Sequence, residues 1–409
     1  MPPLPNPASL NVSSLGAPRF RNLLLVIKQT AFEDYSQLKL RGLAPKALRW
    51  SRLESRHNAH KSCVEGIMGH LRDVNSSGGV RFNVVSRGDL DRQHLHGIDL
   101  VVAVGGDGTV LSSAHYLDNG SIPIVGINSD PSMDDEKIVN KQTDERRSHG
   151  ALCMFTSKEL ERGVRQLLYG TTPPSFRTRI QCTIKSSFSE TRLVPGLNDM
   201  MIAHPIPASV SRFRMGWLGP PMAAAKGPLG CGAGGGGGVG GVPFGGPPAI
   251  VTSTRFGSSV YDVSNSFNVW SSGMWVCTPT GASAAMAAAG GRPMDPVTDR
   301  GLLQYKVREH LVEQKKQAHP DEASGKSTMT SADAEMERIR NLGQGILAKG
   351  GQMHLRWNSA KGGVYIDGSH LCHNLELGDE LLINSRAPEL MLFDRQPDGK
   401  LGDTDCKDE

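Results

Sequence analysis

The sequence predicts two domains, an N-terminal α/β domain of Rossmann-like type and a mostly β C-terminal domain. The chain has 409 residues, which exceeds the roughly 100 to 200 residues of one domain. In the first half, short apolar runs alternate with helical stretches, the pattern of a parallel sheet covered by helices. Beyond Arg179, short apolar runs are separated by turn residues, which indicates a β-rich region. We therefore expect an α/β domain over residues 21–177 and a β-rich domain over residues 178–385.

Each element of the α/β domain is predicted from its hydrophobic pattern. Continuous apolar runs of this length are typical of buried parallel strands, and they occur at residues 23–27, 80–85, 98–104 and 122–127. Helical stretches lie between and after these strands, at residues 46–72, 110–117 and 157–169. In the second domain the expected strands include residues 181–184, 200–203, 275–277, 354–357 and 364–367.

Four segments do not fit a packed core. Residues 1–20 are rich in Pro, Ser and Asn, so we expect a flexible lead. Of the 48 glycines, 14 lie within residues 216–249, which therefore cannot bury enough side-chain surface to offset the entropy of ordering; this predicts a disordered insert. Residues 313–333 form a polar insert that is expected to run into a short helix through Arg340. Residues 386–409 form a C-terminal tail.

Charge and cysteine content exclude several classes of partner. The formal net charge is +4 without a basic run, so we expect no nucleic-acid or membrane partner. The seven Cys residues include no C-x-x-C pair, which argues against a disulfide framework or a structural zinc site. No apolar run approaches the roughly 18 residues that span a bilayer. We expect a cytoplasmic protein; because Glu33 is the first acidic residue, a short transit peptide for an organelle is the alternative.

The sharpest motif is V-V-A-V-G-G-D-G-T at residues 101–109. A strand that ends in glycines lets the backbone approach a ligand, and N–H groups in such a turn and at the next helix N-terminus attract phosphate oxygens. Gly105, Gly106 and Gly108 are the candidate phosphate-binding residues. A carboxylate in such a loop repels phosphates unless a cation or a transferable proton intervenes, so Asp107 suggests Mg²⁺ binding or proton abstraction. A tight turn without a ligand is the alternative interpretation.

This motif resembles the G-G-D-G-T signature of the kinase superfamily that includes NAD kinases, diacylglycerol kinases and sphingosine kinases. Two later segments resemble NAD kinases in particular, namely G-L-N-D-M-M-I-A-H-P at residues 196–205 and S-G-M-W-V-C-T-P-T-G-A-S-A-A at residues 272–285. V-Y-I-D-G at residues 364–368 falls where that family has a late D-G hairpin. Three shorter segments are similar to the plant-type NADH kinase branch: N-S-D-P at 128–131, R-S-H-G-A-L-C at 147–153 and A-S-V-S-R-F at 208–213.

The resemblance implies the two-domain fold of NAD kinases and an ATP-dependent phosphotransferase with an alcohol acceptor. Such an enzyme moves the γ-phosphoryl group of ATP to the 2′-hydroxyl of the adenosine ribose of NADH or NAD⁺, giving NADPH or NADP⁺. Mg²⁺ or another divalent cation accompanies ATP in this chemistry. The family also implies a homo-oligomer, with a dimer expected, and a C-terminal tail that returns to the first domain.

The resemblance also assigns roles to individual residues. Asp107 would receive the proton of the attacking hydroxyl or hold Mg²⁺. The residues expected to bind ATP are Gly105, Gly106, Gly108, Thr109 and Asn128. The residues expected to bind the dinucleotide substrate are Asn198, Asp199, Thr278, Thr280, Gly281 and Ser283.

The chain departs from the broader NAD kinase pattern at two positions. Ser272 stands where most members carry Asp, and Ala285 stands where they carry Tyr. Removing negative charge near the nicotinamide end should favour the neutral dihydronicotinamide ring of NADH over the cationic ring of NAD⁺, which makes NADH preference our hypothesis. A hairpin turn explains the pair Asp367 and Gly368 about as well as substrate contact does, so Asp367 is left outside the site. Two alternative functions remain open, a lipid kinase with the same loop and a catalytically silent NAD(H)-binding protein.

Overall fold

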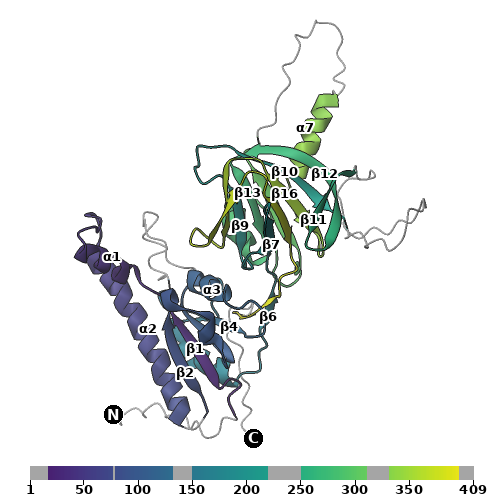
Figure 1. Ribbon diagram of the computed structural model, residues 1–409. Helices are drawn as coiled ribbons and strands as arrows, with labels where there is room; N and C mark the ends of the chain where they lie inside the picture. Colours follow the sequence, from purple (N-terminus) through teal and green to yellow (C-terminus); the bar gives the residue numbers. More distant parts are fainter. Residues whose placement is uncertain (1–16, 77–78, 132–149, 220–249, 311–330, 396–409) are drawn as a thin grey trace, which may run out of the picture. The chain divides into compact units, whose positions relative to one another are not determined.

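The computed structural model describes residues 17–76, 79–131, 150–219, 250–310 and 331–395 (Figure 1). The chain divides into two compact units. The first unit comprises residues 1–176 and 390–409, and the second comprises residues 177–389. The first is α/β and the second is mostly β, so the predicted fold class is confirmed.

The first unit is built on one sheet with the strand order β2-β1-β3-β4-β20-β6 and with β5 beside β4. Its strands are β1 (Asn22–Ile27), β2 (Arg81–Ser86), β3 (Leu100–Gly105), β4 (Ile124–Asn128), β5 (Phe155–Thr156), β6 (Ser175–Arg177) and β20 (Leu390–Phe393). β1 pairs in parallel with both β2 and β3, and β4 pairs in parallel with β3 and β20. The chain therefore adds β2 on one side of β1 and later adds β3 on the other side of β1. The carboxyl ends of β1 and β3 thus form the topological switch point, where open α/β sheets bind ligands.

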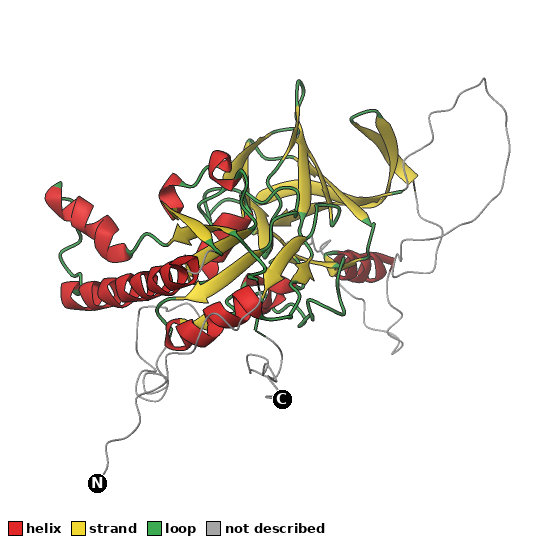
Figure 2. Cartoon of the chain, turned by 90° about the horizontal axis from the view of Figure 1, so that it is seen from below, coloured by secondary structure: helices red, strands yellow, loops and turns green. Residues whose placement is uncertain are grey.

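Helices cover both faces of this sheet (Figure 2). They are α1 (Ala31–Leu40), α2 (Trp50–Ser76), α3 (Asp107–Ala114) and α5 (Leu160–Tyr169), with short 3₁₀ turns η2 (Arg87–Asp89), η3 (Arg92–Leu95) and η4 (Ser157–Glu159). Ile67 of α2 and Leu167 of α5 share one hydrophobic cluster with Leu25 and Val102 of the sheet. On the other face α3 packs so closely that a Cβ at Gly126 would lie 2.7 Å from Val110 Cγ2.

Two helices of this unit differ from the sequence-based expectation. α1 was not anticipated because none of its residues is buried, so it has no apolar stripe. A capping box between Thr30 and Glu33 fixes its first turn instead. α3 begins at Asp107 rather than at residue 110, because extended Gly106 acts as its N-cap and the Asp107 carboxylate suits the positive end of the helix dipole.

The second unit contains two antiparallel sheets. One has the order β11-β12-β10-β16-β19-β7-β8 and the other β15-β14-β13-β9-β17-β18. The first comprises β7 (Gln181–Lys185), β8 (Glu190–Arg192), β10 (Ser211–Leu218), β11 (Ile250–Phe256), β12 (Ser259–Ser271), β16 (Gln352–Trp357) and β19 (Glu380–Asn384). The second comprises β9 (Asp199–Ala203), β13 (Gly273–Cys277), β14 (Leu303–Arg308), β15 (Gln344–Leu347), β17 (Lys361–Ile366) and β18 (Cys372–Glu376). One hydrophobic cluster contains residues of both sheets, such as Ile202 of β9 and Phe213 of β10.

Short helices η5 (Thr280–Ser283), α6 (Ala285–Ala288) and α7 (Ser331–Leu342) complete this unit. The predicted start of the disordered insert at residue 216 is wrong, because residues 216–218 end strand β10. Gly216 packs tightly there, since a Cβ would lie 2.8 Å from Val263 Cγ1. The remainder of the insert, from residue 220 to 249, lies outside the described residues, as do most of the lead, residues 311–330 of the polar stretch and the end of the tail.

Candidate functional site

The glycine loop after β3 is shaped by close packing. A Cβ at Gly105 would collide with Thr109 Oγ1 and would lie 2.8 Å from Lys28 Cβ, so this position requires glycine. The Thr109 N–H donates to the Gly106 carbonyl at 2.9 Å and closes the first turn of α3. Gly108 is exposed and faces open space, since nothing lies within 4 Å of its Cβ position. The loop therefore leaves room in front of the N-terminus of α3, where backbone N–H groups attract anions.

Asp107 lies half-buried in the first turn of α3. Its Oδ1 accepts a hydrogen bond of 2.8 Å from the backbone N–H of Leu152, which orients the carboxylate. The next residue, Cys153, is buried, and desolvation together with the Asp107 carboxylate raises the pKa of its thiol. Cys153 is therefore neutral at physiological pH.

Asn128 and Ser129 follow β4 and are both buried. Asn128 Oδ1 accepts a hydrogen bond of 3.3 Å from the Asp130 N–H. The Ser129 N–H and Oγ both approach the Gly105 carbonyl, at 2.9 and 3.2 Å. The ends of β3 and β4 are thereby tied together beside the glycine loop. The structure thus places the residues predicted to bind ATP in one small region together with Asp107; they are Gly105, Gly106, Gly108, Thr109 and Asn128.

In the second unit the Asn-Asp segment is held by Asp367, which the sequence analysis left outside the site. Asp367 Oδ2 accepts the Leu197 N–H at 2.8 Å, and Oδ1 accepts those of Asn198 at 2.7 Å and Asp199 at 3.1 Å. Asp367 adopts the left-handed conformation, with φ of 51°, directly after β17. Its function is to position the segment that carries Asn198 and Asp199. The D-G pair alone gave no signal of this, because the hydrogen-bond partners lie far away in the sequence.

The T-P-T-G segment packs directly against the same loop. Thr278 Oγ1 donates to the Leu197 carbonyl at 2.6 Å, and the Thr278 N–H donates to the Asn198 carbonyl at 2.9 Å. The Gly281 N–H in turn donates to Thr278 Oγ1 at 3.2 Å. A Cβ at Gly281 would collide with the backbone of Asn198, so this glycine permits the close approach. The two motifs, about 80 residues apart, form one surface.

Two polar atoms on this surface are buried without a partner. Asn198 Oδ1 and Thr280 Oγ1 make no hydrogen bond within the described part of the chain. Such atoms are rare in folded proteins and each needs an explanation, of which a missing ligand is one. Ser283, by contrast, is exposed at the end of η5.

The buried Asp199 carboxyl is a second unusual group here. Desolvation by burial, and then the nearby Asp367 carboxylate, raise its pKa from 3.8 to about 7. Near neutral pH Asp199 can therefore both donate and accept a proton or a hydrogen bond. A ribose hydroxyl, which is also both donor and acceptor, matches this property.

Ser272 in place of Asp was expected to remove negative charge from this region, but another carboxylate lies nearby, so that expectation is wrong. Ser272 Oγ donates to the carboxylate of Glu309, whose backbone adopts a left-handed φ of 39°. Arg308 Nη2 lies 3.1 Å from Glu309 Oε1. The Ser272 hydrogen bond, with a further contribution from Arg308, lowers the pKa of Glu309, so this carboxylate is ionised at neutral pH. Loss of Asp at position 272 therefore does not remove negative charge from this region.

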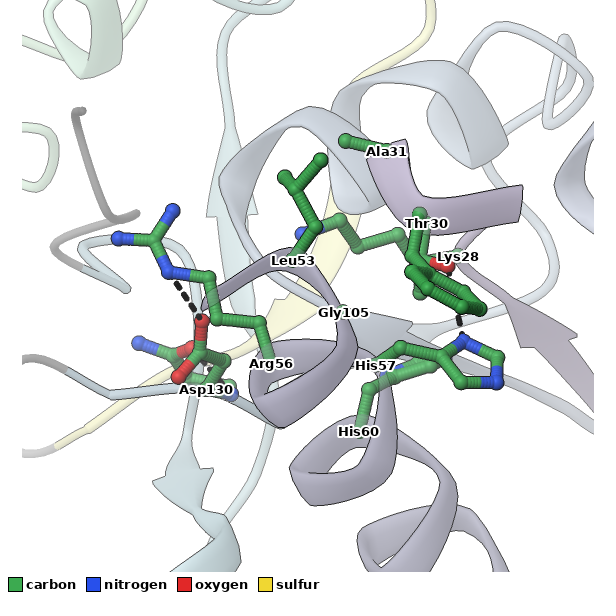
Figure 3. A pocket seen from close by; sticks show the side chains of 11 residues that line it. Lys28, Thr30, Ala31, Leu53, Arg56, His57, His60, Gly105 and Asp130 are labelled. Atoms are coloured by element: carbon green, nitrogen blue, oxygen red, sulfur yellow. Dashed lines mark hydrogen bonds and ion pairs between the residues drawn. The ribbon is translucent and has the colours of Figure 1, made fainter. Parts of the chain in front are cut away.

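A cavity at the carboxyl ends of β1, β3 and β4 was missed by the sequence analysis (Figure 3). Its volume is about 90 Å³, and Lys28, Arg56, His60 and Gly105 are among its lining residues. The available signal was Lys28, a basic residue directly after a buried apolar run. Arg56 and His60 gave none, because they lie on α2, far from the glycine loop in sequence.

The α/β fold of the first unit and the G-G-D-G-T loop after β3 are features of a nucleotide-dependent kinase. Residues 19–131 match the family described as the ATP-NAD kinase N-terminal domain. The probable NADH kinase of Oryza sativa subsp. japonica is 32% identical over 357 residues, covering 87% of this chain and 86% of the relative. The NADH kinase of Arabidopsis thaliana is 30% identical over 378 residues, covering 91% and 95%. The chain belongs to the NAD kinase family and is of the plant type.

The fold is also that of a solved relative. The crystal structure of yeast NADH kinase complexed with NADH superimposes with a TM-score of 0.52 at 13% identity, covering 93% of this chain and 85% of the other. This superposition concerns the fold alone. The family match and the two plant relatives identify the chain as an ATP-dependent kinase of NAD or NADH, as the resemblance implied. The comparisons give no support to the lipid-kinase or silent-binding alternatives.

Proposed function

We propose that the chain transfers the γ-phosphoryl group of ATP to the 2′-hydroxyl of the adenosine ribose of NADH or NAD⁺, with NADH preferred. The observation that carries this proposal is the unpaired buried pair Asn198 Oδ1 and Thr280 Oγ1. Leaving such an atom unsatisfied costs roughly 1 to 3 kcal/mol, which an adenosine amino group and hydroxyls would offset. Asp199 is adjacent in sequence and offers an acceptor for a ribose diol.

In the proposed reaction the 2′-oxygen forms a bond to the γ-phosphorus as the bond from that phosphorus to the ADP oxygen breaks. Asp107 accepts the proton that the hydroxyl loses, and the Leu152 N–H keeps the carboxylate in place. Gly105, Gly106, Gly108 and Thr109 present the loop to the phosphates, and Asn128 supports it from β4. Transfer of this kind depends on positioning and charge stabilisation.

The residues fit a divalent cation that arrives with ATP. Among the described residues, no group of three or more His, Cys, Asp or Glu could hold a metal ion. Mg²⁺ usually binds through one or two carboxylates together with substrate phosphates and water, so a dedicated protein cage is unnecessary. Asp107 is the carboxylate that would hold the ion, as the alternative to its role as proton acceptor. When bound, the ion would neutralise charge on the phosphates.

The NADH preference is supported by the two plant relatives, whose names identify them as NADH kinases. The charge argument from Ser272 no longer contributes, because Glu309 supplies a carboxylate at this position. Equal kcat/KM for NADH and NAD⁺ in the purified protein would refute the preference.

Two further properties are proposed from the sequence. We expect a homodimer, which light scattering of the purified chain tests, since a monomeric mass would refute it. We expect a cytosolic location, which a fluorescent fusion tests, with peroxisome or mitochondrion as the contrary results. None of the described helices has both the length and the apolar character needed to cross a bilayer.

The direct test incubates purified protein with ATP, Mg²⁺ and either NADH or NAD⁺. A dehydrogenase that requires the 2′-phosphate detects the product. Asp107→Asn should lose most of the activity, whereas Asp89→Asn, a matched change at an exposed carboxylate of the same unit, should keep it. No product from either acceptor would refute the function, and an undiminished rate in Asp107→Asn would refute the role of that carboxylate.

A further inference from the structure

The cavity beside the glycine loop lies where three parallel strands end. Lys28 follows β1, Gly105 ends β3 and Asn128 ends β4, and all three line it. Figure 3 shows that Arg56, His57 and His60 reach it from one helix, while Lys28 and Thr30 come from the segment after β1. Because roughly 10 to 15 Å³ suffices for one water molecule, the cavity of about 90 Å³ has room for a small anion.

His60 provides an unpaired polar atom that indicates a ligand. Its side chain is 5% exposed, it lines the cavity, and its Nε2 is buried with no hydrogen bond to any described residue. The other ring nitrogen, Nδ1, lies 2.8 Å from Ser129 Oγ. The Ser129 hydroxyl lies 2.8 Å from Nδ1 and 3.2 Å from the Gly105 carbonyl, so Nδ1 is its nearer acceptor. In that tautomer Nε2 carries the proton. Nε2 makes no hydrogen bond among the described residues, while an interaction with the Lys28 backbone acts to raise the pKa of His60.

The charges around the cavity favour an anion. Lys28 and Arg56 contribute two cations, and Asp130 is the only acidic residue in the lining. The Arg56 Nε lies 3.9 Å from Asp130 Oδ2, so Asp130 is already associated with Arg56. Within the described ranges, no hydrogen bond or ion pair engages the Lys28 ammonium. Burial lowers the pKa of Lys28, whereas Asp130 acts to raise it, and an incoming anion would stabilise the charged form further.

We propose that this cavity binds a phosphate group of the donor's triphosphate tail, with Lys28 as the principal cation and His60 Nε2 as a neutral donor. Burial, followed by the charge of Lys28, lowers the pKa of His60 to about 4, so the ring stays neutral near pH 7 and donates through one nitrogen. Gly105, which lines the cavity, lies two residues before Asp107 in the sequence. A phosphate seated there would fix the donor beside the loop. This inference rests on the proposed kinase function.

Three probes separate the phosphate tail from the rest of the donor. Calorimetry on the full chain measures binding of ATP, inorganic tripolyphosphate and adenosine. Lys28→Ala should weaken ATP and tripolyphosphate by at least about tenfold, the effect of one charged hydrogen bond, and should leave adenosine unchanged. Lys61→Ala removes an exposed cation from the residue next to His60 on α2 and should change none of the three.

A second pair of variants isolates the His60 nitrogen. His60→Gln places an amide nitrogen near the position of Nε2, whereas His60→Asn places one near Nδ1 and leaves the cavity without a donor. Tripolyphosphate binding should be weakened several-fold more by His60→Asn than by His60→Gln. Equal binding by these two variants would overturn the role of Nε2, even if both fold less stably than the parent.

The outcomes also separate this proposal from the function itself. Unchanged tripolyphosphate binding in Lys28→Ala would overturn the phosphate assignment in an enzyme that still makes NADPH. A higher KM for NADH with an unchanged KM for ATP would overturn it too, because the cavity would then hold the pyrophosphate of the acceptor. Lys28-dependent tripolyphosphate binding in a chain that makes no product would support the cavity and refute the kinase function.

Discussion

Replacing Asp367 by Asn tests how the dinucleotide surface is held in place. The carboxylate accepts three backbone N–H groups, from Leu197, Asn198 and Asp199. Asn keeps the left-handed conformation but has one acceptor oxygen, so its amide nitrogen must face either the Leu197 N–H or the other two donors. The least damaging orientation loses one hydrogen bond to a charged group, worth about 1.5 to 3 kcal/mol. We expect Asp367→Asn to lower the free energy of unfolding by about 2 kcal/mol.

The same change should weaken NADH binding. If the loop that carries Asn198 moves, and about 1.4 kcal/mol of the loss appears in binding, the Kd for NADH rises tenfold. Urea titration and fluorescence titration with NADH measure the two effects, and the KM for ATP should not change. Asp295→Asn is the control, because Asp295 is exposed and also accepts backbone N–H groups, from Val297 and Thr298, both at 2.8 Å. Our reasoning fails if Asp367→Asn and Asp295→Asn leave NADH affinity equally unaffected.

Three further changes test other parts of the site. Gly281→Ala forces a Cβ into the backbone of Asn198, so NADH affinity and melting temperature should both fall, whereas Gly69→Ala, in open space on α2, should cause neither loss. Asp199 has a folded-state pKa of about 7 against 3.8 for the free group, so the folded chain retains a proton that the unfolded chain loses, and stability falls as pH rises from 4 to 7. The free energy of unfolding of Asp199→Asn, measured by urea titration, should therefore rise relative to that of the parent between pH 4.5 and 8, by roughly 4 kcal/mol at most. A difference between the two free energies that does not change with pH would contradict the raised pKa of Asp199. Glu309→Gln should raise the NADH to NAD⁺ ratio of kcat/KM, because it removes negative charge, and an unchanged ratio would place Glu309 away from the nicotinamide.

Local sequence patterns were sufficient to predict strands β1 to β4 of the first unit and its glycine loop, but not the short strands β5, β6 and β20. β3 is buried along its whole length, so its apolar run identifies it directly, and the loop follows it without a gap. α1 was not predicted by the same reasoning, because residues 31–40 show little hydrophobic periodicity, and none of them is buried. The start of the glycine-rich insert was misplaced for a related reason, since Gly216 is required by packing against β12 rather than by chain flexibility.

The supporting contacts of the site could not be predicted because they join distant parts of the chain. Asp367 binds the Leu197 N–H across 170 residues. His60 meets Ser129 across 69 residues. Motif spacing identifies which segments carry chemistry, but the groups that orient those segments have no fixed offset from them. The charge at Ser272 illustrates the same limit, because the carboxylate that approaches it comes from Glu309, which directly follows strand β14.

The central claim is that this chain places a phosphate on the adenosine 2′-oxygen. Phosphorus NMR of a reaction with ATP, Mg²⁺ and NADH measures this directly, since a 2′-monoester and ADP give distinct signals. We predict that both appear in equal amounts and that NADH is consumed to the same extent. ADP and inorganic phosphate without a new ester, or an ester at any other oxygen, would contradict the account.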